Sequence, residues 1–159
     1  MTTKSDFTEE EWTRVVRAPF VAGLAISLAD PGGPIETAKE SMASLKAATN
    51  PPSREQLLAE VALEIQAMAQ ARQNPLSGFK PAKGTAAGEM VVEELAAAQA
   101  LVASRATPEE TTAFGTWLVA VAQDAADAAK DGGFMGFGAE QVSQREQAMI
   151  DRVRAAVAS

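Results

Sequence analysis

Hydrophobic residues recur along this chain at intervals of three and four, the spacing that places side chains on one face of a helix. The clearest stripe comprises Trp12, Val15, Val16, Pro19, Phe20, Leu24 and Leu28. Similar stripes begin near residues 57, 91, 114 and 149. No segment shows the alternation of hydrophobic and polar positions that is typical of a half-buried strand. The pattern therefore predicts an all-α single domain, residues 1–159, of six or seven packed helices.

Four capping boxes mark where helices are expected to start, each a Ser or Thr followed three residues later by Glu or Gln. They begin at Thr8, Ser53, Thr107 and Ser143. Phe7 and Trp12 stand at the two positions of a hydrophobic staple around the first box. Pro34 suits the first turn of another helix, which we expect to run to about residue 48. Pro19 is expected to kink or split the first helix.

Three segments lack a helical pattern. Residues 1–6 are polar and are predicted to be disordered, and residues 75–86 contain Gly, Pro and Lys, as a surface loop does. Residues 131–142 form a Gly-rich loop between the last two predicted helices.

The amino-acid composition excludes several kinds of catalytic and metal-binding site. The 159 residues include no cysteine, histidine or tyrosine, so the commonest general base and the thiolate and imidazole ligands of zinc and haem are absent. The formal net charge of -7 disfavours nucleic acids and anionic membranes as partners. The longest hydrophobic stretch, 19–29, is shorter than the roughly 20 residues that span a bilayer. We expect a cytoplasmic protein with no zinc, haem or nucleotide, whose partner is another protein or a second copy.

Two segments share one plan: a hydrophobic helix, an Asp-Gly turn and a new helix with an early acidic residue. The first runs from Ala29-Asp30 to Glu40, and the second from Asp131-Gly132 through Ser143 to Glu146. This plan resembles the TerB-like (tellurite-resistance) family, and the two copies suggest a weak internal duplication. Pro31 and the insert 134–141 depart from the family pattern.

The resemblance implies an all-helical fold and a non-enzymatic accessory or adaptor protein with a stress-related role. It also implies that the acidic residues bind a metal ion or a partner. Oxygen ligands favour Ca²⁺ or Mg²⁺, and the candidate ligands are Asp30, Glu40, Asp131 and Glu146. The alternative is that these residues serve only as helix caps and turns.

The Gly-rich loop carries Phe134, Met135 and Phe137 among four glycines. Flexible backbone bearing large hydrophobic side chains suits a protein partner or a hydrophobic ligand. The alternative is that the two phenylalanines fold back and cover the end of the core.

Three functions are consistent with these features. The first is an adaptor of the TerB-like type that binds a protein partner or, weakly, a divalent ion. The second is a small helical ligand-binding protein with the Phe134–Phe137 loop as a lid. The third is a carboxylate-dependent metallohydrolase, for which the spaced acidic pairs are Glu60 and Glu64, Glu89 and Glu93, and Asp124 and Asp127.

Overall fold

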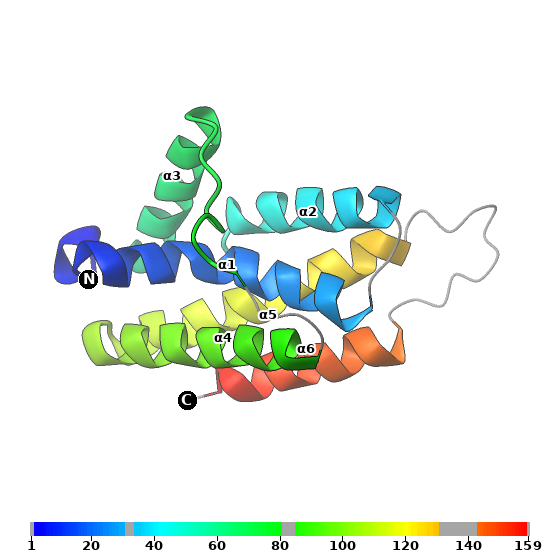
Figure 1. Ribbon diagram of the computed structural model, residues 1–159. Helices are drawn as coiled ribbons and strands as arrows, with labels where there is room; N and C mark the ends of the chain where they lie inside the picture. Colours follow the sequence, from blue (N-terminus) through cyan, green and yellow to red (C-terminus); the bar gives the residue numbers. More distant parts are fainter. Residues whose placement is uncertain (1, 31–33, 81–84, 131–142, 159) are drawn as a thin grey trace.

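The computed structural model describes residues 2–30, 34–80, 85–130 and 143–158, and most of these are helical (Figure 1). The α-helices are α1 (Glu9–Ala29), α2 (Pro34–Ala48), α3 (Gln56–Gln70), α4 (Thr85–Arg105), α5 (Pro108–Lys130) and α6 (Gln144–Ala156). A short 3-10 helix, η1 (Lys4–Asp6), precedes them. No strand occurs in the described ranges, which confirms the predicted all-α class. Within those ranges, no helix has the length and hydrophobicity needed to cross a bilayer.

Helices α1 and α5 form the centre of the bundle, because each of them contacts all of the other α-helices. Helix α2 lies along α5 and α1, whereas α4 and α6 cover the opposite side (Figure 1). Helix α3 projects away from this group, with its first residues against the body of the molecule (Figure 1).

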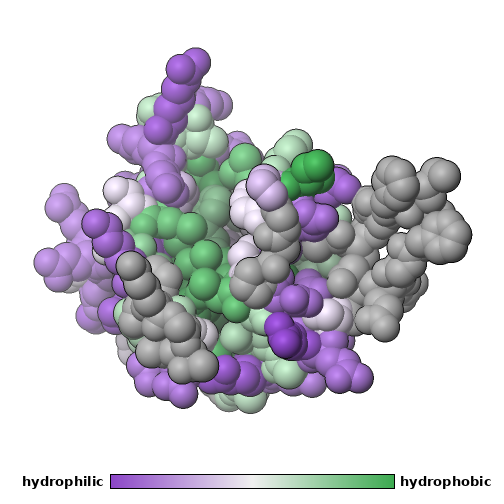
Figure 2. Space-filling model, turned by 45° about the vertical axis from the view of Figure 1, so that its right-hand side comes forward, coloured by the Kyte–Doolittle hydropathy of each residue, from purple (hydrophilic) through white to green (hydrophobic). Residues whose placement is uncertain are grey.

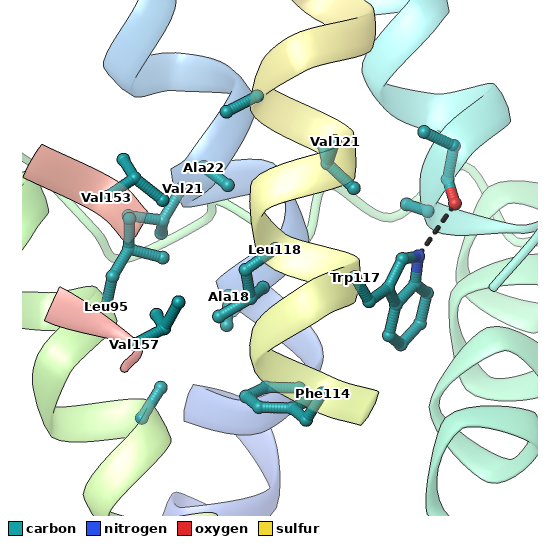
Figure 3. Close-up of a cluster of buried hydrophobic side chains, with 14 of the residues drawn as sticks. Ala18, Val21, Ala22, Leu95, Phe114, Trp117, Leu118, Val121, Val153 and Val157 are labelled. Atoms are coloured by element: carbon teal, nitrogen blue, oxygen red, sulfur yellow. Dashed lines mark hydrogen bonds between the residues drawn. The ribbon is translucent and has the colours of Figure 1, made fainter. Parts of the chain in front are cut away.

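The core between these helices is filled by the predicted stripes. Phe114 and Leu118 of α5 are fully buried beside Ala18 of α1, and Leu95 of α4 completes the cluster (Figure 3). Buried alanines on α1 and α5 allow the two helix axes to approach closely. Most stripe residues are therefore core residues, whereas Phe20, Leu24 and Leu28 are half-buried and pack against the core.

Trp117 joins the core to α2. Its ring is 1% exposed, and its indole N–H donates a hydrogen bond of 2.8 Å to the backbone carbonyl of Ala47 (Figure 3). A buried indole N–H needs such an acceptor, since an unpaired donor in the core is costly. This bond fixes the C-terminal end of α2 against α5.

Three of the four predicted capping boxes are confirmed. Thr8, Thr107 and Ser143 each accept a hydrogen bond from the backbone N–H three residues later, at 3.1 Å in every case. The aromatic staple also forms, since the ring centroids of Phe7 and Trp12 lie 5.7 Å apart.

The capping box at Ser53 was a wrong prediction. Helix α3 begins at Gln56, and its N-cap residue, Glu55, makes no side-chain cap bond. The amide of Leu57 instead donates to the carboxylate of Glu110 at 3.0 Å. A side chain from α5 therefore caps α3, because α5 places a buried carboxylate next to the free amides of the α3 first turn.

The first residues also differ from the prediction of disorder for 1–6. Thr2 is 4% exposed, and its hydroxyl and amide both donate to Glu110. Residues 4–6 form η1, which contacts α3. Burial of Thr2 against α5 orders this polar segment.

Pro19 does not split α1, which is continuous from Glu9 to Ala29. The side chain of Pro19 is buried, so its packing offsets the loss of one helical hydrogen bond.

The described part of the predicted loop 75–86 is non-helical as far as residue 80, and helix α4 begins at Thr85. The loop is not only a surface connection, because Leu76 and Phe79 are half-buried and pack on the core. The guanidinium of Arg17 lies 5.2 Å from the Phe79 ring centroid. These contacts hold the segment against α1.

Candidate functional site

A cavity of about 520 Å³ lies where α1, α2, α3 and residues 73–76 meet. We name it the Glu40 cavity, after the acidic residue in its wall. Its hydrophobic lining consists of Phe20, Leu24, Leu45, Ile65, Ala69, Pro75 and Leu76. Figure 2 shows hydrophobic side chains lining a hollow in the face of the molecule below the protruding end of α3. The volume falls within the range typical of small-molecule sites, about 300–1,000 Å³.

Helical spacing brings the lining residues to one side of each helix. Phe20, Leu24 and Ser27 stand four and three residues apart along α1, so they share one face. On α2, Glu40 and Ser44 are likewise four residues apart. The polar groups of both helices therefore enter the cavity from the side where α1 and α2 run together.

Glu40 is the acidic residue of this wall and is only 3% exposed. The hydroxyl of Ser27 donates a short hydrogen bond to its carboxylate across the α1–α2 interface. Among the described residues, Ser27 is the only group that hydrogen-bonds this carboxylate. A buried carboxylate usually has an ion-pair partner or several donors, so Glu40 is unusual.

The surroundings of Glu40 favour its neutral form. Burial is the main cause that raises the pKa of the Glu40 carboxyl, and the hydrogen bond from Ser27 partly opposes it. The acidic residues that raise this pKa further are Glu146, Asp30 and Glu36. The net result is a pKa above the ordinary glutamate value.

Close approach of α1 and α2 places Ser27 next to Glu40. One turn before Ser27, a Cβ added to Gly23 would overlap the Ser44 hydroxyl and lie 2.8 Å from the Ser44 Cβ. Only glycine allows this separation, because any side chain would push the helices apart. An isolated glycine inside a hydrophobic helical stripe is a sequence signal of such an approach.

The structure gathers three of the four candidate metal ligands at one end of the bundle. Glu40 of α2 is influenced by the charges of Glu146 and Asp30, which belong to α6 and to the end of α1. Asp131 lies outside the described residues. In the part of the chain that is described, no three acidic groups come together closely enough to hold a metal ion. The negative charges of Glu40, Glu146 and Asp30 therefore influence one another, but the described acidic residues do not provide the ligands of a metal site.

Two of these acids also have the structural roles that the alternative interpretation gave them. Glu146 is 2% exposed and completes the capping box of Ser143. Asp30 is the C-cap residue of α1.

The acidic pairs of the metallohydrolase hypothesis do not line the Glu40 cavity. Glu89, Glu93, Asp124 and Asp127 are exposed. Glu64 accepts hydrogen bonds from Lys4 and the Trp12 indole, and Glu60 accepts one from Gln56. These acidic groups therefore lie at the surface or stabilise local structure through hydrogen bonds.

The predicted ligand-binding residues Phe134, Met135 and Phe137 lie outside the described residues. Sequence reasoning missed the lining residues Phe20 and Leu76, because they read as ordinary members of a helix stripe and a loop. The sequence signal that could have indicated this cavity was the polar Ser27 within an otherwise hydrophobic helix.

No protein-family model, curated protein or solved structure matches this chain. Function is therefore inferred from the Glu40 cavity and the groups that line it.

Proposed function

We propose that this chain is a non-enzymatic accessory protein that binds a small, largely hydrophobic ligand in the Glu40 cavity. The observation that carries the proposal is the cavity itself, which has about 520 Å³ of space, hydrophobic walls and a few polar groups on one side. Small-molecule sites commonly have this composition, in which the walls provide affinity and the polar groups orient the ligand.

The chemistry of the lining supports binding without catalysis. The hydroxyl of Ser27 is beside Glu40, as a nucleophile would be beside a base. However, acyl transfer also needs preorganised donors for an oxyanion, and Ser27 lies inside α1, where helical bonds engage the backbone N–H groups. With no cysteine or histidine in the sequence, the cavity has no stronger nucleophile or base.

This role fits the accessory function that the TerB-like resemblance implies. The ligand-binding hypothesis is preferred over a metal-dependent role, because the described acidic residues do not form a group that could hold a metal ion.

Binding of the neutral hydrophobic dye Nile red tests the proposal. We expect a saturable, one-to-one rise in its fluorescence with the wild-type protein. Ala69 is an exposed residue that lines the cavity from α3, so Ala69→Trp places an indole at the cavity and should abolish the signal. Gln70→Trp is the matched control, because Gln70 is exposed in the same turn and does not line the cavity.

The two variants give opposite results only if the dye occupies the cavity. Equal binding by both variants, or no saturable binding by the wild type, would contradict the proposed function. Circular dichroism of both variants checks that the helices remain intact.

A further inference from the structure

The polar side of the Glu40 cavity carries a buried acidic group that has no counter-ion among the described residues. No lysine or arginine of the described segments lines the cavity. Within the described part of the chain, the charged groups that act on Glu40 are Glu146, Asp30 and Glu36, all of which are acidic. An isolated buried carboxylate is unfavourable, and a cation placed beside it offsets part of that cost.

Hydroxyl groups of α2 line the cavity together with this carboxylate. Thr37 and Ser44 lie three residues before and four residues after Glu40, on the same face of α2, and both line the cavity. Ser41 lines it as well. A head group with several N–H donors would find acceptors in these hydroxyl oxygens as well as in the carboxylate.

The remaining walls are hydrophobic and extend toward α3. Ile65 and Ala69 contribute from α3, and Leu76 contributes from the segment that follows it. The cavity therefore has a negative, hydroxyl-rich side and a hydrophobic side.

We propose that the Glu40 cavity binds a primary amine with a hydrocarbon tail, its ammonium group beside Glu40 and its tail against the α3 wall. This inference rests on the proposed ligand-binding function and specifies the ligand class. An ammonium group needs one carboxylate and a few acceptors, whereas a metal ion needs a set of ligands that the described acidic residues do not provide. A carboxylate ligand would be repelled by Glu40 and its acidic neighbours.

Calorimetry with three ligands that share one tail tests the proposal: n-octylamine, 1-octanol and octanoate. Wild-type protein should bind octylamine at least about tenfold more tightly than octanol, because the charged head adds a charge-assisted hydrogen bond. Octanoate should bind most weakly. The proposal would be overturned if either octanol or octanoate bound as tightly as octylamine.

Substitution of Glu40 separates a specific contact from general attraction to an acidic protein. Glu40→Gln should remove the tenfold preference for octylamine over octanol. Glu89→Gln removes the same charge from an exposed site on α4 and should keep the preference. Loss of the preference in both variants, or in neither, would overturn the role of Glu40. The ranking of ligands by the wild type tests the proposal even if a variant folds poorly.

Failure of this inference can be distinguished from failure of the proposed function. Octanol binding that Ala69→Trp blocks and Gln70→Trp preserves, without any preference for octylamine, would refute the amine and retain the cavity. If none of the three ligands binds, both proposals are wrong.

Discussion

Glu110, in the first turn of α5, accepts hydrogen bonds from the hydroxyl of Thr2 at 2.7 Å and from its backbone amide at 3.2 Å. The same carboxylate accepts the amide of Leu57 at 3.0 Å and that of Thr107 at 3.4 Å. One buried side chain thus joins the start of the chain, the start of α3 and the start of α5.

Removal of this carboxylate should destabilise the fold. In Glu110→Ala the amide of Leu57 and the groups of Thr2 lose their acceptor while still buried, and each buried unpaired donor costs roughly 1–3 kcal/mol. We expect a clear loss in the free energy of unfolding, measured with urea. Glu109→Ala is the matched control, because Glu109 is exposed and such changes usually stay within about 0.5 kcal/mol. Equal stability of the two variants would refute this role of Glu110.

Glu40 and Glu110 should make opposite contributions to the pH dependence of stability. Burial acts to raise the pKa of Glu110, but hydrogen bonds from Thr2, Leu57 and Thr107 outweigh it, so the pKa is lowered. The stability that Glu110 adds is present above the ordinary glutamate pKa and is lost as the pH falls through its lowered value. The pKa of Glu40 is raised, so its contribution is fully present below the ordinary value and is lost as the pH rises through the raised value.

Urea denaturation between roughly pH 4 and pH 7 measures both contributions, because carboxyl groups titrate across this range. Relative to the wild type, Glu40→Gln should gain stability as the pH rises, and Glu110→Gln should lose it. Parallel pH profiles for the two variants would show that one of these pKa shifts has the wrong sign.

Gly23→Ala should separate α1 from α2. The new Cβ would lie 2.8 Å from the Ser44 Cβ, and such overpacking typically costs about 1–3 kcal/mol. Ser44→Gly in the same chain should restore part of the loss, since it removes the atoms that clash. A double-mutant cycle measures this coupling, and additive effects of the two changes would contradict the close approach.

Divalent ions should act weakly. Ca²⁺ and Mg²⁺ prefer oxygen ligands, so they should raise the melting temperature slightly by screening the charges of Glu40, Glu146 and Asp30. Zn²⁺ should find no dedicated site, because the sequence contains no histidine or cysteine. Tight, stoichiometric zinc binding in calorimetry would refute this expectation.

The sequence by itself determined where most helices lie. Pro34 as a first-turn residue, with an expected end near residue 48, predicted α2 to within a residue, and the boxes at Thr8, Thr107 and Ser143 predicted three helix starts. These features are local, because a capping bond and a helical stripe depend on residues only three or four positions apart. The all-α class follows from the same short-range pattern.

Tertiary structure alone decided the cap of α3 and the existence of the cavity. The box at Ser53 did not form because α3 begins only at Gln56, where Glu110, distant in sequence, accepts the amide of Leu57. The sequence singled out Glu40 as an acidic candidate, but its burial and its contact with Ser27 depend on how closely α1 and α2 approach. The cavity beside it is lined by residues of three helices and of segment 73–76, so it depends on how these elements pack together. Such long-range packing depends on the shapes of whole helix faces, which no local pattern encodes.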